Sequence, residues 1–464
     1  MKTMKLLSPN GHLGFAPLRP ESFERGLDEA PDIIAADSGS SDIGPAPLAL
    51  DYSTSPLEWQ RADLEHMLLA ARRLKVPMII GSSGDSGSNS RVDLYVRLIK
   101  EIADEHGLEP FRIGYFYSEV PVGELRRRLE AGMVMAGLDG RSQLTLDDLD
   151  RTDRVVAVAG VHPFVKLLDE GADVIIGGRS SDSAIFAAPA IRAGFAEASS
   201  YHLGKLLECA SFCAEPYGGK ESVLGTISAE DIRVAAMHPE QRCTVASVSS
   251  HAMYERPNPF SELVLGGHLD MSRCHYEQAD VRTTRITGAV FEKAEQLTVK
   301  LEGAGRVGER FIGFAGIRDP YTIAHIDEVI DWSRNEVTQA FGDDGYSLFY
   351  HRYGIDGVMG QWEPTPVAGH EVGLVVEAVA PTVAKAEQVC MTATRQLFYA
   401  RLPEVKGTAG STAFLFDEVI RARPACTWTI DHIMPVDDPL ELFPTHMTQA
   451  GISSQAGEVK AGVR

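Results

Sequence analysis

The sequence predicts an α/β protein with an N-terminal doubly wound, mostly parallel sheet and a C-terminal α+β domain. Three apolar stretches that contain Ile-Ile each run into a loop of Gly, Ser and Asp, at residues 31–42, 77–89 and 173–182. A short β-branched run that is bounded by turn residues and followed by an amphipathic segment is typical of a buried parallel strand. Strand-like and helix-like segments also alternate from residue 1 to about 230. This alternation favours right-handed crossovers within a doubly wound sheet.

In the segments between these strands, apolar residues recur with the spacing of helices or of further strands. Residues 90–106 place apolar side chains on one face of a helix that ends near Gly107. The other elements predicted in this half are strands at 111–117 and 154–159 and helices at 122–131 and 162–170. Neither G-x-G-x-x-G nor G-x-x-x-x-G-K-[ST] occurs here, so the usual dinucleotide-binding and P-loop motifs have no support.

Beyond about residue 235 the pattern changes to that of an α+β domain. Predicted antiparallel strands lie at 244–249, 281–290, 296–301, 311–317 and 372–378, with a turn at 303–305 and helices at 326–341 and 384–402. We therefore expect an α/β domain at 1–235, an α+β domain at 236–444 that closes a cleft over the strand-end loops, and a loose polar tail at 445–464.

Composition excludes several classes of partner. The 464 residues include 44 Lys and Arg against 65 Asp and Glu, a net charge of −21 that argues against nucleic acid or an anionic membrane. No run of 18 apolar residues and no signal-peptide core is present, so we expect a cytoplasmic protein. The six cysteines are scattered, which favours buried thiols over disulfides or a zinc site. A small anionic substrate is the expected partner, and a homo-oligomer or a partner subunit stays open.

The three Gly/Ser/Asp loops are interpreted as one binding site, because the carboxyl ends of parallel strands meet at one edge of the sheet and bind ligands there. Glycine allows close backbone approach, and hydroxyls and amides supply donors. The residues predicted to bind substrate are Ser38, Gly39, Ser40, Ser82, Ser83, Gly84, Asn89, Arg179, Ser180 and Ser181.

Four aspartates in these loops are candidates for catalysis or for metal binding. Asp85 and Asp182 are the predicted catalytic carboxylates, and Asp37 and Asp42 are candidate ligands for Mg²⁺ or Mn²⁺, although no cofactor is certain. The alternative is that each aspartate caps a helix or closes a turn.

A histidine is the other predicted proton-transfer group, because imidazole exchanges a proton near neutral pH. His202, which precedes a helical pattern, is the predicted catalytic histidine, and His12 and His268 stand in Gly-bounded settings that also suit this role. The alternative is that each is a structural histidine of the interior.

Arg179 is the only cation placed in the predicted site. A guanidinium at the end of the third strand can bind a substrate carboxylate through two parallel hydrogen bonds. The alternative is a structural ion pair with one of the nearby aspartates.

Four short sequence segments, here called strings, are similar to those of a known family. They are residues 36–45 (ADSGSSDIGP), 178–183 (GRSSDS), 201–209 (YHLGKLLEC) and 266–270 (GGHLD). With these strings the chain resembles the acyclic terpene utilisation protein AtuA family, over about residues 8–444. The resemblance implies a place in the catabolism of citronellol and geraniol type compounds, where the family has been linked to a lyase step on a branched 3-hydroxyacyl-CoA. It assigns no catalytic residue.

From the loops and the resemblance we expect an enzyme, a lyase or hydratase of a branched 3-hydroxy acid or its CoA thioester. One alternative is an isomerase or C–N lyase of a small dicarboxylate, which would use the same donors. Another is a non-catalytic subunit that binds an acyl ligand for a partner enzyme. The sequence pattern does not choose between them, because one fold serves many reactions.

Overall fold

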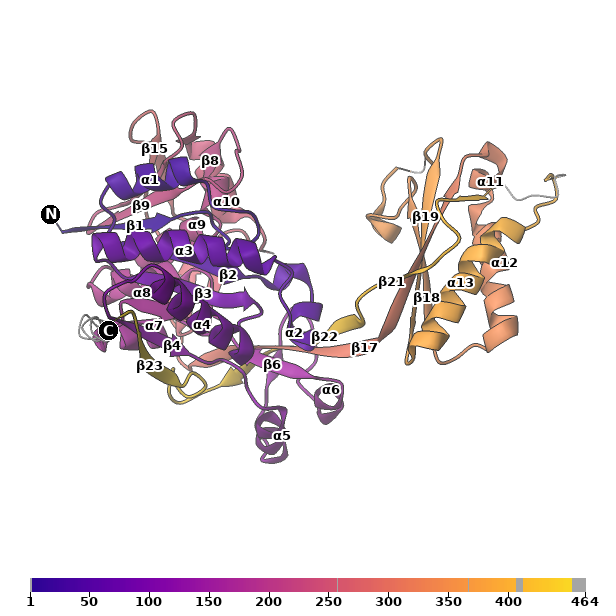
Figure 1. Cartoon of the computed structure of the whole chain (residues 1–464), viewed down its shortest axis with the longest axis horizontal. Coiled ribbons are helices and arrows are strands. Elements are labelled where there is room, and N and C mark those ends of the chain that lie inside the picture. Colours follow the sequence, from indigo (N-terminus) through magenta and orange to yellow (C-terminus); the bar gives the residue numbers. More distant parts are fainter. Residues whose placement is uncertain (1, 257, 366, 406–411, 453–464) are drawn as a thin grey trace, which may run out of the picture. The chain divides into compact units, whose positions relative to one another are not determined.

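The computed structural model describes residues 2–256, 258–365, 367–405 and 412–452. The chain forms two compact units, here called unit 1 (Met1–Gly305 and Trp428–Arg464) and unit 2 (Arg306–Thr427), which are labelled by their elements in Figure 1. The predicted boundary between residues 235 and 236 falls inside unit 1. No helix in the described part of the chain is long and apolar enough to cross a membrane.

Unit 1 is built on a ten-stranded mixed sheet, and this confirms the mixed α/β class. Its strand order is β14-β15-β10-β9-β1-β2-β3-β7-β4-β23. The five central strands are parallel: β1 (Thr3–Ser8), β2 (Ile33–Gly39), β3 (Met78–Asp85), β7 (Val174–Ile176) and β4 (Phe111–Phe116). The flanking strands are antiparallel: β9 (Val223–Ser228), β10 (Ile232–Ala236), β15 (Thr283–Thr287), β14 (His275–Gln278) and β23 (Thr445–Ala450). The Ile-Ile stretches are thus β2, β3 and β7, as predicted.

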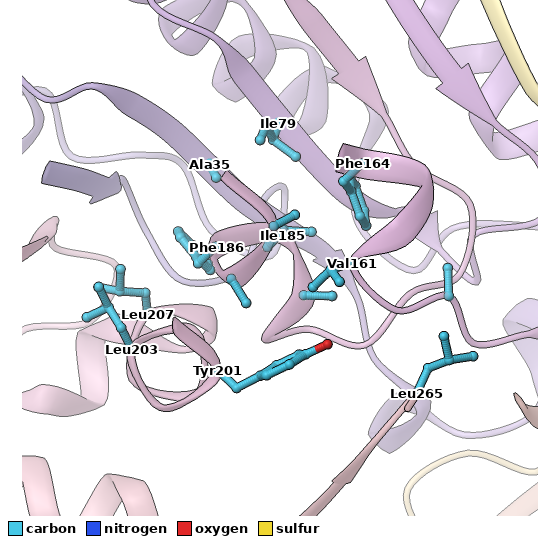
Figure 2. Packing of buried hydrophobic residues seen from close by; sticks show 14 of the residues in the cluster. Ala35, Ile79, Val161, Phe164, Ile185, Phe186, Tyr201, Leu203, Leu207 and Leu265 are labelled. Carbon is cyan, nitrogen blue, oxygen red and sulfur yellow. The ribbon is translucent and has the colours of Figure 1, made fainter. Parts of the chain in front are cut away.

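Helices cover both faces of the central strands, because adjacent strand residues point to opposite faces and both are apolar. Ile34 packs in one core with α3 (Leu57–Leu74) and α4 (Asn89–Glu105). Ala35 packs in the other core with α7 (His162–Asp169), α8 (Ala184–Arg192) and α9 (Glu197–Glu208), as Figure 2 shows. The shorter helices of unit 1 are α1 (Pro20–Asp28), α2 (Ala46–Leu50), α5 (Val122–Glu130), α6 (Leu146–Asp150) and α10 (Val245–Met253). The finer description as a doubly wound sheet stays a prediction.

Two smaller sheets complete unit 1. One contains β12 (Ser261–Val264), β13 (Gly267–Asp270) and β16 (Val290–Lys293). The other uses the first part of the long strand β17 (Thr298–Ile317), which pairs with β6 (Arg154–Ala157) and β22 (Ala425–Pro435), and β22 pairs in turn with β5 (Ala136–Gly137). A two-residue pairing joins β8 (Ala214–Glu215) to β11 (Arg242–Cys243).

Unit 2 contains the rest of β17 in a sheet with β19 (Val372–Ala380) and β18 (Ser347–Tyr353), and the short strands β20 (Thr412–Phe414) and β21 (Ile420–Arg421) also pair with β17. The helices α12 (Ile326–Phe341) and α13 (Val383–Tyr399) share one apolar core with this sheet, and α11 (Pro320–Ala324) precedes them. The predicted helices at 326–341 and 384–402 and the strand at 372–378 are confirmed.

Two predicted elements of the second half were wrong. The predicted strand at 244–249 is the start of helix α10, because Thr244 and Ser247 form a capping box that begins a helix despite the β-branched residues. The predicted turn at 303–305 lies inside β17, which continues without a break. A Cβ on Gly305 would lie 1.7 Å from Arg151 O, so this glycine permits close backbone packing rather than a turn.

The predicted loose tail is partly wrong as well. Residues 445–450 form β23, which pairs along its full length with β4 at one end of the large sheet. Phe443, just before it, is 1% exposed and meets Phe116 edge to face at 6.3 Å between ring centroids. The sequence pattern did not indicate a strand at β23, because most of its side chains are polar. A strand at the end of a sheet buries only some of its residues and can therefore keep polar side chains. Residues 453–464 lie outside the described part.

Phe443→Ala should lower the free energy of unfolding by about 3–5 kcal/mol, the usual cost of removing a buried phenyl ring. Urea unfolding monitored by circular dichroism measures this change. The matched control is Met447→Ala on β23, whose side chain is 36% exposed and whose loss should change stability by no more than about 0.5 kcal/mol. Equal effects of the two substitutions would contradict the assignment of Phe443 to the core.

Candidate functional site

The three predicted loops lie together at the carboxyl ends of β2, β3 and β7. Ser82 Oγ accepts hydrogen bonds from Ser180 N (3.3 Å) and Arg179 Nη1 (3.1 Å), which joins the second loop to the third. A Cβ on Gly39 would lie 2.5 Å from Ser82 O, so the first loop also packs directly on the second. The expectation that the loops converge is confirmed, because neighbouring parallel strands end at the same edge.

Most polar groups in the first two loops bond within the protein. Ser38 Oγ lies 2.6 Å from Tyr95 OH, and Ser83 Oγ donates to Gly177 O at 2.8 Å. Asn89 Oδ1 accepts from Glu119 N at 3.3 Å. Ser40 Oγ accepts from Asp42 N, and Gly84 N donates to Ser38 Oγ. These contacts order the loops. Most of the residues predicted to bind substrate do not line the main pocket of unit 1, namely Ser38, Gly39, Ser40, Ser82, Ser83, Gly84, Asn89 and Ser180.

The main pocket of unit 1 has a volume of about 620 Å³ and opens beside the third loop. Of the predicted residues, Arg179, Ser181 and Asp182 line it. Helix α9 adds Lys205 and Glu208. The remaining polar wall consists of Ser183, Arg256, Glu262, His268, Glu292, Lys293, Thr298, Lys300 and Glu302, and the apolar wall includes Leu138, Val158, Leu263, Val264, Leu265 and Ile433. A site of this size with mixed walls is typical of small-molecule binding.

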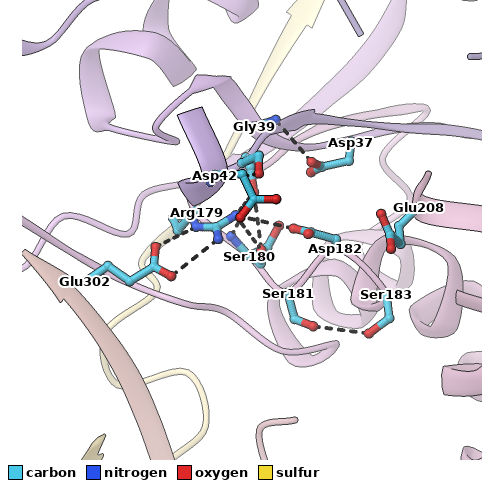
Figure 3. Close-up of polar contacts among 12 residues, drawn as sticks. Asp37, Gly39, Asp42, Arg179, Ser180, Ser181, Asp182, Ser183, Glu208 and Glu302 are labelled. Carbon is cyan, nitrogen blue, oxygen red and sulfur yellow. Dashed lines mark hydrogen bonds and ion pairs between the residues drawn. The ribbon is translucent and has the colours of Figure 1, made fainter. Parts of the chain in front are cut away.

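Three carboxyl groups gather at the inner end of this pocket. Figure 3 shows Asp37, Asp182 and Glu208 beside the third loop, with Asp182 between Arg179 and Glu208. Burial raises the pKa of Asp37 well above its usual value, and the negative charge of Asp182 adds to the effect. Asp37 Oδ1 is buried without a hydrogen-bond partner in the described structure. A carboxyl whose pKa is raised by burial and by a neighbouring carboxylate can hold a proton that an isolated carboxyl would release.

Glu208 is a carboxyl whose pKa lies near neutrality. Burial raises the pKa of Glu208, the positive charge of Lys205 lowers it, and the negative charge of Asp182 raises it further. Together these effects give a pKa of about 7. Lys205 Nζ donates to Glu208 Oε1 at 2.6 Å. Glu208 is also the last residue of α9, where the helix dipole disfavours negative charge. A carboxyl of this kind can give and take a proton at neutral pH.

Asp182 stands at the pocket wall with 36% of its side chain exposed. Burial raises its pKa, although the positive charges of Arg179 and Lys205 oppose the change. Nearby, Ser181 Oγ and Ser183 Oγ lie 3.1 Å apart and line the same wall. The placement of Asp182 is therefore compatible with its predicted catalytic role, which stays a prediction.

Arg179 is hydrogen-bonded within the protein, and its role in binding a substrate carboxylate stays a prediction. Its Nε donates to Glu302 Oε2 (2.8 Å) and its Nη2 to Glu302 Oε1 (3.4 Å), while Nη1 faces Ser82 and Asp182. Burial alone would raise the pKa of Glu302, but Arg179 and Lys300 outweigh it and lower that pKa to about 2. The structure thus contains the ion pair of the alternative interpretation, with Glu302 as the main partner.

Asp85 is bonded within the protein, and its catalytic role stays a prediction. It is 2% exposed, and its Oδ2 accepts from Thr54 Oγ1 (2.8 Å), Ser53 Oγ (3.0 Å) and Thr54 N. These bonds hold the segment after α2 against the second loop. Asp85 does not line the main pocket.

His202 also lies away from the pocket, although it belongs to the same helix as Glu208. Its ring is buried, with Nε2 3.2 Å from Tyr276 OH and Nδ1 3.5 Å from Cys274 Sγ. Burial lowers the pKa of His202 to about 3, so the ring is neutral. The catalytic role of His202 stays a prediction. Of the other candidates, His268 lines the pocket, with Nε2 2.6 Å from Ser261 Oγ.

The proposed Mg²⁺ or Mn²⁺ ligands do not converge. Asp37 is buried behind the main pocket, whereas Asp42 is exposed and lines a separate cavity of about 290 Å³. Among the described residues, no group of three or more His, Cys, Asp or Glu side chains has an arrangement suited to a metal ion. The metal prediction thus has no ligand cluster to support it.

The sequence patterns missed Lys205, Glu208, Arg256, Glu262 and Glu302. The first two lie in a string that carries the family resemblance, and their spacing of three residues on a helix was the available signal. The others come from β12, β17 and the segment before β12, which the tertiary structure brings to the third loop.

Comparison with known proteins identified a family. The family model described as "Acyclic terpene utilisation family protein AtuA" matches residues 7–427. Searches of curated proteins and of solved structures returned no match.

Arg179→Lys should lower the free energy of unfolding by about 1.5–3 kcal/mol, because lysine keeps the charge but not the paired bonds to Glu302. Chemical denaturation of the purified protein measures the change. Arg126→Lys is the control, since the Arg126–Asp150 pair is exposed and its contribution should not exceed about 1 kcal/mol. Unchanged stability of the Arg179 variant would show that the Glu302 pair is not structural.

Proposed function

The chain belongs to the acyclic terpene utilisation AtuA family, and on this basis we propose that it is a catabolic lyase or hydratase of a branched 3-hydroxy acid or its CoA thioester. Family membership indicates involvement in acyclic terpene utilisation. The reaction class rests on the pocket of unit 1, and above all on Glu208, a buried carboxyl with a pKa of about 7 that faces this pocket.

Both reactions need a group that moves a proton near neutral pH. In a dehydration, a base takes the C2 proton, the electrons form the C2–C3 double bond, and the 3-hydroxyl leaves as water after protonation. In a C–C lyase, a base takes the 3-hydroxyl proton, the C2–C3 bond breaks, and the enolate fragment takes up a proton at C2. Glu208 is the proposed base in either case.

Asp182 is the proposed second proton-transfer group. It lines the same wall, its raised pKa favours a bound proton, and its charge is coupled to that of Glu208. When two interacting carboxyls share a site, one holds a proton while the other is ionised. Such a pair supplies a base and an acid together, as water elimination requires.

The apolar wall supports a branched hydrocarbon substituent. Val158, Leu265 and Ile433 line the same pocket as Lys205 and Glu208. Burial of each methylene group contributes about 0.8 kcal/mol to binding. An acyl chain on this wall would leave the hydroxyl and carbonyl groups to the polar side.

Glu208→Gln should reduce kcat by about 100-fold or more, because the amide keeps the shape but cannot accept the proton. Turnover of branched 3-hydroxyacyl-CoA thioesters and free acids is measured by mass spectrometry of products. Glu295→Gln, an exposed glutamate outside the pocket, is the control. Full activity of the Glu208 variant would remove it from the mechanism, and binding without turnover by the wild type would favour an acyl-binding subunit.

The pH dependence has a definite sign. A base must be ionised to act, so kcat/KM should fall about tenfold per pH unit below a pKa of about 7. A pH series from 5 to 9 on the wild type measures this profile. A profile that rises as the pH falls would contradict the assignment of Glu208 as base.

A further inference from the structure

The sheet of unit 2 carries its two long helices on one face. Figure 1 shows α12 and α13 on the same side of β17, β18 and β19, and Phe311 and Ala315 of β17 are buried in the core beneath them. Because successive residues of a strand point to opposite faces, the residues between these two point away from the helices. This second face is here called the open face, and its central residues are Phe314, Gly316, Phe349, Tyr353, Gly373 and Val375.

The open face is apolar, whereas the outer face of an antiparallel sheet is normally polar. Phe314, Phe349 and Tyr353, here called the aromatic ridge, are 39%, 47% and 50% exposed. Phe314 lies directly opposite Val375 on β19, and Val375 lies opposite His351 on β18. The side chains therefore form one continuous surface across three strands. A contiguous exposed apolar surface marks a site of contact with another molecule.

A strip of small residues lies beside the aromatic ridge. Gly316 pairs with Gly373 on β19 and with Ala413 on β20, so the three form a row across the sheet, here called the glycine strip. A Cβ on Gly316 would meet no atom closer than 4.0 Å, and a Cβ on Gly373 would lie 3.6 Å from the Phe314 ring. The open face thus has raised rings next to uncovered backbone, a relief into which a surface of the same shape can pack.

The charged groups at the centre of the open face compensate one another. His351 Nε2 lies 2.9 Å from Glu377 Oε2, and Arg310 Nη1 lies 3.6 Å from Glu377 Oε1. A second molecule that covers Glu377 would therefore leave no unpaired charge. The whole chain has a net charge of −21, so two copies repel each other in general. The open face is a place where this repulsion is weak and where a highly charged partner has little to bind.

The size of the open face is compatible with a dimer interface. It spans β18, β19, β17 and the short strands β20 and β21, which fill one further strand position beside β17. Four strands about 4.8 Å apart and about seven residues long cover roughly 450 Å². Two such faces bury about 900 Å² before the relief of the side chains is counted, and specific interfaces begin at about 1,200 Å².

We propose that the open face of unit 2 is the interface of a homodimer, in which the sheets of two copies pack face to face around a two-fold axis. Such an axis brings the same surface of each copy together, so the aromatic ridge of one copy can lie on the glycine strip of the other. Facing sheets interdigitate their side chains in this way. The dimer concerns unit 2 and does not depend on the reaction proposed for the pocket of unit 1.

Sedimentation equilibrium of the full chain measures the Kd of the dimer. The wild type should dimerise with a Kd in the micromolar range or tighter. Gly316→Lys places a long cation on the glycine strip, and the monomer should fold unchanged because a Cβ has room at this position. Packing of two such copies would bury two lysine charges without partners, so the Kd should rise about 100-fold or more.

A second variant and two matched controls locate the interface. Tyr353→Lys removes one ring of the aromatic ridge and adds a charge there, and it should also raise the Kd about 100-fold or more. Its control is Tyr399→Lys, the same change at a tyrosine that is 52% exposed on α13. The control for Gly316→Lys is Gly123→Lys on α5, where a Cβ meets no atom within 4 Å. Both controls should keep the wild-type Kd within about twofold.

Circular dichroism shows which variants are folded, and the wild-type mass tests the proposal even if a variant is not. A wild type that stays monomeric at about 100 µM, well above the Kd of such an interface, would overturn the homodimer and leave the open face to a different partner. Folded Gly316→Lys or Tyr353→Lys protein that dimerises like the wild type would overturn it too, because the dimer would then use another surface. Equal weakening by Tyr399→Lys would have the same meaning.

Discussion

The buried pair between Arg179 and Glu302 joins the third strand-end loop to β17, and the pocket of unit 1 depends on this attachment. Arg179 comes from the loop after β7, and Glu302 comes from a strand more than a hundred residues later. Lys300, two residues from Glu302, adds a second cation to the same carboxylate. A fork with two bonds to one carboxylate fixes direction as well as distance. The polar floor of the pocket is therefore set by an ion-pair group that no ligand has to complete.

The same pairing shapes the chemistry of the neighbouring carboxyls. Glu302 takes the shortest hydrogen bond of Arg179, at 2.8 Å, whereas the guanidinium lies 3.3 Å from Asp182 and farther from Asp37. Burial then dominates, and it raises the pKa values of Asp37, Asp182 and Glu208. Because Arg179 pairs mainly with Glu302, its charge does not keep the other carboxyl groups ionised, and they can hold protons. This is the physical basis for acid–base chemistry in a pocket that contains many charged groups.

Several residues have surroundings in the structure that their residue type alone does not indicate. Asp85 has the setting of a catalytic carboxylate in the sequence, yet the Ser53 and Thr54 donors that occupy it come from a segment thirty residues earlier. His202 shares α9 with Glu208, and only the packing of β14 decides that its ring meets Tyr276. The expected turn at Gly303 and Gly305 is part of a continuous strand, because β6 and β22 pack closely on it.

The sequence by itself determined the parallel strands β2, β3 and β7, the convergence of their loops and the family, because apolar runs and local strings are properties of contiguous residues. It also determined the main helices, whose 3.6-residue period is local. Only the tertiary structure decided which loop lines a pocket, which partner Arg179 takes, and that Glu208 and Glu262 face the same space. Those outcomes depend on burial and on charges from distant segments, and the pKa of a carboxyl responds to both.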